Sequence, residues 1–170
     1  MRGMSDVLIG LGSNVGDRLG HLRKAVDGLR PVLRHLEVSA VYETAPVGVL
    51  TQPAFLNAAV RGEASIGPQR FFFLAKSLEC AAGRRPGPTL GPRQLDLDII
   101  AFGDLVVATT RLRIPHHAFA KRGFVLAPLA DVAADLTLPG ADATVRTLAG
   151  HVGRAGVARV LPPASLAATR

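Results

Sequence analysis

Stretches with strand composition occur in pairs along this chain, between stretches whose apolar residues follow helical spacing. We expect strands over residues 7–13, 38–47, 54–64, around Asp96 and Asp98, and 105–114, and helices over 19–29, 68–79 and 119–134. Two consecutive strands can join as an antiparallel hairpin, whereas parallel neighbours need a longer crossover. The order therefore predicts an α/β (α+β) fold of the ferredoxin-like kind, a mainly antiparallel sheet flanked by helices.

The composition is that of a globular domain. Of 170 residues, 48% are hydrophobic and 19% are charged, which is enough to bury a core. We expect a single domain over residues 1–160 and a C-terminal tail over 161–170. The lone Cys80 excludes an internal disulfide, and its apolar helical surroundings predict a buried thiol. Because no apolar run reaches about 18 residues, we expect a cytoplasmic protein with no membrane segment.

The charge points to anionic partners. Seventeen arginines and three lysines give a formal net charge of +7, which favours nucleotides, nucleic acid or acidic surfaces. The alternative is that the arginine content reflects genome composition and carries no functional information.

The segment with sequence GPRQLDLDII, residues 91–100, contains the strongest chemical signal. Side chains two apart in a strand point to the same face, so Asp96 and Asp98 should lie side by side. Two such carboxylates repel each other unless a cation lies between them, and Arg93 adds an anion-binding group. A purely structural role, as paired charges on an edge strand, fits poorly because the apolar flanks indicate a central, well-packed strand.

One glycine-rich motif and two adjacent histidines have competing interpretations. The sequence GLGSNVG at residues 10–16 resembles a dinucleotide fingerprint with the third glycine misplaced, and a helix cap at Ser13 or Asn14 explains most of it. No Gly-Lys pair occurs, which excludes a P-loop. His116 and His117 should point apart in an extended segment, so they are poor partners for one zinc ion. Beside Arg122, a histidine could instead donate to a phosphate.

An RNA-binding module on a ferredoxin-like sheet is the competing functional class. The sequence Arg122-Gly123-Phe124 opens like the RNA-recognition signature, but the match ends after three residues. Aromatic residues total 5%, which is few for base stacking. We therefore expect no nucleic-acid partner.

Four segments together resemble a known family: residues 10–14, residues 42–48 with 52–57, residues 91–100, and residues 114–116 with 122–124. In this order they are similar to 6-hydroxymethyl-7,8-dihydropterin pyrophosphokinase of folate biosynthesis, over about residues 7 to 135. The resemblance implies transfer of pyrophosphate from ATP to the hydroxymethyl group of the reduced pterin, with release of AMP. It implies two magnesium ions, ATP as co-substrate and, in our interpretation, a monomer.

The resemblance also assigns roles to individual residues. Asp96 and Asp98 match the magnesium ligands, and with Arg84 and Arg93 they form the expected catalytic set. The pterin ring would lie between Phe55 and Phe124. Further pterin contacts would come from Asn57 and from groups around Thr44, Ala45 and Val47. The positions that match nucleotide contacts are Glu79, Arg84, Arg93, Ile99, Arg111, His116 and Arg122.

Some positions depart from the family pattern. Leu90 stands where a tryptophan is common, His117 replaces a common aromatic residue, and Arg113 replaces a small polar one. The resemblance makes residues 84–93 a mobile loop that orders over the nucleotide. Here the loop is short and contains Pro86 and Pro88, and proline restricts the open ensemble. We therefore expect a smaller movement of residues 84–91 than in relatives with longer loops.

Overall fold

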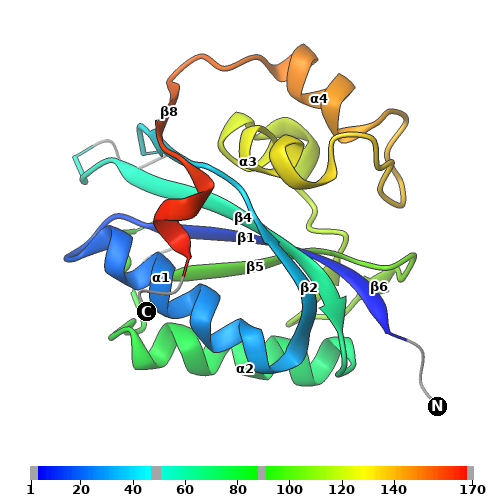
Figure 1. Cartoon of the computed structure of the whole chain (residues 1–170), viewed down its shortest axis with the longest axis horizontal. Helices are drawn as coiled ribbons and strands as arrows, with labels where there is room; N and C mark the ends of the chain where they lie inside the picture. Colours follow the sequence, from blue (N-terminus) through cyan, green and yellow to red (C-terminus); the bar gives the residue numbers. More distant parts are fainter. Residues whose placement is uncertain (1–3, 47–50, 88–90, 168–170) are drawn as a thin grey trace.

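The computed structural model describes residues 4–46, 51–87 and 91–167. Its core is a six-stranded sheet in the order β5-β1-β4-β3-β8, with β2 also paired to β4. Every pairing in this sheet is antiparallel. The six strands are β1 (Ser5–Ser13), β2 (Leu33–Val38), β3 (Val41–Thr44), β4 (Phe55–Ala64), β5 (Asp96–Phe102) and β8 (Val157–Leu161). The expected antiparallel sheet flanked by helices is confirmed (Figure 1).

Helices cover both faces of the sheet (Figure 1). On one face lie α1 (Arg18–Leu29) and α2 (Pro68–Ala81), and on the other lie α3 (Gly123–Ala133) and α4 (Val145–Val152). The residues Leu22, Ala25, Val26 and Leu29 of α1 are buried at the i, i+3, i+4, i+7 spacing of one helix face. Short 3-10 helices span Arg30–Val32, Phe119–Lys121 and Pro163–Leu166.

Alternate residues of β1 serve the two faces. Val7, Ile9 and Leu11 pack in the cluster that contains the buried residues of α1 and α2, whereas Leu8 packs with α3. Strand β5 follows the same alternation: Leu97 and Ile99 face α1 and α2, and Ile100 faces α3. Asp96 and Asp98 share the parity of Ile100, so they belong to the α3 face.

Several expected boundaries were wrong. Residues 33–38 form β2, which was missed because its charged side chains obscure any alternation. Residues 105–114 are not one extended run but a two-stranded hairpin of β6 (Val107–Ala108) and β7 (Arg113–Ile114). Cys80 is exposed, since α2 turns Phe71, Ala75 and Glu79 inward instead.

The expected C-terminal tail over residues 161–170 is also not a free tail where the structure describes it. Leu161 ends β8, which pairs with β3 at the edge of the sheet. Leu166 is fully buried against the α1 and α2 core, and Arg23 donates from Nε to the Ser165 carbonyl oxygen at 2.8 Å. Within the described residues, no helix is both long and apolar enough to cross a membrane.

Candidate active site

A cavity of about 570 Å³ lies on the α3 face of the sheet. Its floor is a row of side chains that crosses four strands, because cross-strand partners share a face. Thr44 of β3 pairs with Phe55 of β4, Asn57 pairs with Gly12 of β1, and Gly12 pairs with Asp96 of β5. Two residues before Gly12 in β1, Gly10 pairs with Asp98. All these residues line the cavity.

The two glycines keep the middle of this floor open. A Cβ atom on Gly12 would lie 3.3 Å from Oδ1 of Asn57, closer than ordinary packing allows. Any side chain at residue 12 would therefore press on Asn57 and fill the space between β4 and β5. The aromatic and amide groups of β4 and the carboxylates of β5 thus line one uninterrupted cavity.

Asp96 and Asp98 lie on the same face, as their spacing predicts, but their strand is not central. Strand β5 is at the edge of the sheet, next to β1 only. Its apolar residues are nevertheless buried, with Leu97 2% and Ile100 0% exposed. Side chain and loop groups cap the free edge: Glu79 accepts from the Leu97 amide at 2.8 Å, and the His116 amide donates to the Ile100 carbonyl oxygen at 2.9 Å.

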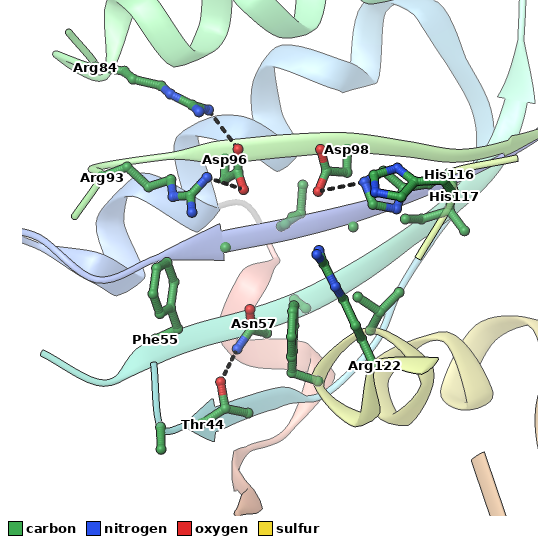
Figure 2. A pocket seen from close by; sticks show the side chains of 18 of the residues that line it. Thr44, Phe55, Asn57, Arg84, Arg93, Asp96, Asp98, His116, His117 and Arg122 are labelled. Carbon is green, nitrogen blue, oxygen red and sulfur yellow. Dashed lines mark hydrogen bonds and ion pairs between the residues drawn. The ribbon is translucent and has the colours of Figure 1, made fainter. Parts of the chain in front are cut away.

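Two arginines converge on Asp96 (Figure 2). Arg84 Nη1 lies 2.6 Å from Oδ1, and Arg93 Nη1 lies 3.0 Å from Oδ2. The same Arg84 nitrogen is 2.9 Å from Oε1 of Glu79. Arg93 Nε is buried and has no hydrogen-bond partner among the described residues. The site thus concentrates positive charge around one carboxylate and leaves a donor for a further acceptor.

Asp98 is in a different electrostatic position. Desolvation in the cavity, and next the charge of Asp96, raise the pKa of Asp98 from 3.8 to about 6. A carboxylate with a raised pKa beside a second carboxylate is a site at which a cation would relieve repulsion. Among the described residues, no three His, Cys, Asp or Glu side chains gather at one point. These two carboxylates suit Mg²⁺, which commonly takes one or two protein carboxylates and fills its shell with water and phosphate oxygens.

His116 reaches the site as a neutral donor. Desolvation, and next the charges of His117 and Arg122, lower the pKa of His116 to about 4. The Ala118 amide donates to its Nδ1 at 3.3 Å, so the ring proton resides on Nε2. Nε2 lies 3.9 Å from Oδ2 of Asp98. The expectation that the two histidines point apart was wrong: their rings stack at 4.7 Å because the segment turns instead of extending.

Two aromatic rings line the other end of the cavity. Phe55 and Phe124 both border it, together with Ala45. Arg93 lies over the Phe55 ring at 5.7 Å, and Arg122 lies over the Phe124 ring at the same distance. Asn57 donates from Nδ2 to Oγ1 of Thr44 at 2.7 Å (Figure 2). This bond fixes the amide so that its oxygen faces the Gly12 side.

The structure does not place every expected site residue on the cavity. Glu79 is buried, with its oxygens bound to Lys76, Arg84 and the Leu97 amide, and it lines a smaller neighbouring pocket. Ile99 packs on the α1 and α2 side of the sheet. Arg111 is exposed in the β6–β7 turn and does not line the cavity. Val47 and Leu90 are outside the described residues, so their expected roles stay predictions.

Two cavity-lining residues were not predicted from the sequence. Lys76 and His117 line the cavity without having been assigned to it. The three-residue spacing of Lys76 and Glu79 on one helix was the available signal for Lys76.

Asn14 is not a helix cap: α1 is capped by Asp17, whose side chain accepts from the Gly20 amide at 2.9 Å. The Asn14 amide binds other parts of the chain.

Comparison with known proteins gives a consistent family. The model of 7,8-dihydro-6-hydroxymethylpterin-pyrophosphokinase matches residues 8–134. A 2-amino-4-hydroxy-6-hydroxymethyldihydropteridine pyrophosphokinase of Methylorubrum extorquens is 38% identical over 92% of this chain and 99% of its own length. The enzyme of the same name from Bacillus subtilis is 42% identical over 73% of this chain and 75% of its own length.

Two further relatives are larger proteins. A mitochondrial folate synthesis bifunctional protein of Arabidopsis thaliana is 39% identical over 92% of this chain, which spans 31% of the length of that protein. The crystal structure of an HPPK-DHPS protein in complex with substrates superposes with a TM-score of 0.71, covering 88% of this chain and 43% of that one. At 12% identity, this last likeness supports the fold alone.

Proposed function

The chain belongs to the 7,8-dihydro-6-hydroxymethylpterin-pyrophosphokinase family, and we propose that it transfers pyrophosphate from ATP to 6-hydroxymethyl-7,8-dihydropterin. In this reaction the hydroxymethyl oxygen attacks the β-phosphorus of ATP. The bond from that phosphorus to the α–β bridging oxygen breaks, AMP leaves with that oxygen, and the hydroxyl proton is released. The product is the pterin diphosphate ester, an intermediate of folate biosynthesis.

The observation that carries the proposal is the row of residues across the sheet. Aromatic rings and a fixed amide lie at the β3–β4 end, and two carboxylates with two arginines lie at the β5 end. Gly10 and Gly12 separate the two ends by backbone only. A flat heterocycle at one end can therefore present its hydroxymethyl group to a polyphosphate at the other. Holding two reactants in this way is a large part of catalysis.

The pterin end suits a flat heterocycle with a polar edge. Phe55 and Phe124 offer two ring faces, and stacked aromatic pairs gain about 0.5–1.5 kcal/mol beyond their buried area. Asn57 presents an amide whose orientation is set by its bond to Thr44. An amide with a fixed donor and acceptor can discriminate a pterin edge from other flat rings, because a mismatched edge leaves a polar group unpaired.

At the phosphate end, we propose that Asp96 and Asp98 hold two magnesium ions. Such ions neutralise phosphate charge and orient the polyphosphate when they are bound. Arg84 and Arg93 supply charge to the transferred group, and the unpaired Nε of Arg93 is a donor for a phosphate oxygen. His116 donates from Nε2, and its occupied Nδ1 makes it a donor to phosphate instead of a general base.

The arginines must exchange partners for this to happen. Both are paired with Asp96 in this structure, so a cation held at this carboxylate would free the two guanidinium groups to bind phosphate oxygens. Glu79 would keep Arg84 near the site both with and without a cation at Asp96, because the Glu79 carboxylate is buried and also accepts from the Leu97 amide. We propose that Glu79 acts on the nucleotide through Arg84, and that the enzyme works as a monomer.

The test is nucleotide analysis after incubation with Mg²⁺ and ATP, with and without hydroxymethyl-dihydropterin. We expect AMP only when the pterin is present, and no AMP from Asp96→Ala or Asp98→Ala. ADP as the nucleotide product would refute the proposal. Salt-dependent RNA binding without pterin-dependent AMP release would favour the competing nucleic-acid-binding class.

A further inference from the structure

Asn14 follows β1 directly and is 1% exposed, yet it does not line the cavity. Its side chain makes three hydrogen bonds to two segments that are far apart in the sequence. Oδ1 accepts from the Arg93 amide at 2.9 Å. Nδ2 donates to Oε1 of Gln52 at 2.9 Å and to the Pro53 carbonyl oxygen at 3.1 Å.

On one side, Asn14 fixes the backbone of Arg93. The backbone amide of Asn14 also donates to the Arg93 carbonyl oxygen at 3.1 Å, so both the backbone N–H and the backbone C=O of Arg93 are bound to Asn14. The Arg93 guanidinium then reaches Asp96 and lies over the Phe55 ring. With its backbone anchored at two points, the arginine has only side-chain torsions left to vary.

On the other side, Asn14 fixes the approach to β4. Pro53 lies two residues before Phe55, which begins β4 and lines the cavity. Gln52 is itself 8% exposed. Arg18 supports the same segment by donating from Nη1 to the Ala54 carbonyl oxygen at 2.8 Å. Asn14 therefore touches the segments that carry an arginine of the phosphate end and an aromatic ring of the pterin end.

We propose that Asn14 is a positioning residue that sets Arg93 relative to Phe55, and so relative to the pterin. The proposal rests on the proposed pyrophosphate transfer and adds to it a residue that touches neither substrate. Only an amide of this length serves both sides, because it accepts at one atom and donates twice from another. Displacing a reacting group by about 1 Å can cost about 100-fold in rate.

Two substitutions separate the two sides. Asn14→Ala removes all three side-chain bonds but leaves the backbone bond to the Arg93 carbonyl oxygen. Asn14→Asp keeps an acceptor for the Arg93 amide and loses both donors to the Gln52 and Pro53 oxygens. We expect Asn14→Ala to lower kcat about 100-fold. Asn14→Asp should lower kcat less and raise KM for the pterin about tenfold, because it disturbs chiefly the approach to Phe55.

A double-mutant cycle with Arg93→Ala separates positioning from general loss of structure. If Asn14 acts through Arg93, Asn14→Ala changes kcat less than about threefold in the Arg93→Ala background. The matched control is Ser39→Ala. Ser39 is also buried and joins two backbone segments, accepting from the Ala59 amide at 2.8 Å and donating to the Ala40 carbonyl oxygen at 2.6 Å. It should lower thermal stability and leave kcat within about twofold.

Hydrogen exchange at the Arg93 amide gives a readout without substrate. It should accelerate at least tenfold in Asn14→Ala and stay near wild type in Asn14→Asp, where the acceptor remains. Equal kcat losses in both Arg93 backgrounds, an unchanged kcat, or unchanged exchange in Asn14→Ala would each overturn the proposal. A wild-type chain that releases no AMP would refute the proposed function, and the exchange result would still decide whether Asn14 anchors Arg93.

Discussion

Replacing Asp98 by asparagine should stabilise the metal-free protein while it abolishes the reaction. In the folded chain, desolvation and the charge of Asp96 raise the pKa of Asp98 from 3.8 to about 6. The folded state therefore disfavours the ionised carboxylate, and at neutral pH that cost is present in full. An asparagine of the same shape carries no charge and removes the cost.

The magnitude follows from the shift. A difference of about two pKa units corresponds to about 3 kcal/mol. The Asp98 side chain is 39% exposed, and solvent screening at such exposure reduces the expected gain to about 1 kcal/mol. For a chain of this length, that is a rise in Tm of about 3 °C.

The pH dependence has a definite sign. Because the folded-state pKa of Asp98 lies above the unfolded value, the stability linked to this carboxyl is fully present below about pH 4 and is lost as the pH rises through about 6. The advantage of Asp98→Asn should therefore be largest at pH 7–8 and shrink toward pH 5.

The assay is thermal unfolding with a metal chelator at pH 8, 7, 6 and 5, and again at pH 8 with Mg²⁺ and a non-hydrolysable ATP analogue. With these ligands the wild type should gain stability and Asp98→Asn should not. Asp135→Asn is the control, since that side chain is 87% exposed and remote from the cavity. An Asp98→Asn protein that is less stable than wild type at pH 8, or an advantage independent of pH, would refute the reasoning.

Three further predictions follow from single contacts. Arg84→Ala should lower kcat but tighten Mg²⁺ binding in the absence of nucleotide about threefold or more, because it removes a cation from Asp96. Calorimetric titration of Mg²⁺ measures this, with the exposed Arg85→Ala as the control. Weaker Mg²⁺ binding by Arg84→Ala would contradict the prediction. Leu166→Ala should lower the free energy of unfolding, measured in urea, by about 3 kcal/mol, because the side chain is fully buried. The control Val160→Ala, at an exposed position, should lower it by less than about 0.5 kcal/mol. Similar losses in both variants would mean that the C-terminal segment does not support the core. Phe55→Ala should weaken pterin binding about tenfold or more and leave nucleotide binding within about twofold, as measured by pterin fluorescence and nucleotide titration; equal losses of both would oppose the two-ended site.

Much of the fold was predictable because local patterns and burial agree. The helix over 19–29 was found to within one residue because its apolar residues recur at helical spacing. The strand over 54–64 was found as closely because a short, mostly apolar run is typical of a strand, and here the strand is buried on both faces. Strand β2 and helix α4 were missed for the opposite reason. The first has the polar residues Arg34, His35 and Glu37 among six, and its register against β4 shifts between Arg34 and Glu37, so the sequence shows no regular alternation. The second is only eight residues long and buries one side chain, Val145.

The site was only partly predictable. Two residues two apart in a strand must share a face, so the pairing of Asp96 and Asp98 needed no structure. The edge position of β5 could not be predicted in this way. Residues from α2 and from the His116 segment cap that edge, so the apolar residues of β5 are buried as in a central strand. Asn14 was misassigned because a cap and a long-range anchor use the same side-chain groups. Only tertiary contacts distinguish the two.

The most direct measurement of the proposed transfer is ³¹P NMR of the reaction of ATP, Mg²⁺ and hydroxymethyl-dihydropterin. We predict that ATP signals give way to AMP and to two mutually coupled signals of a diphosphate ester on the pterin, with none formed by Asp96→Ala. A single uncoupled phosphate signal on the pterin together with ADP would contradict pyrophosphate transfer. So would AMP that forms with free pyrophosphate at the same rate without the pterin.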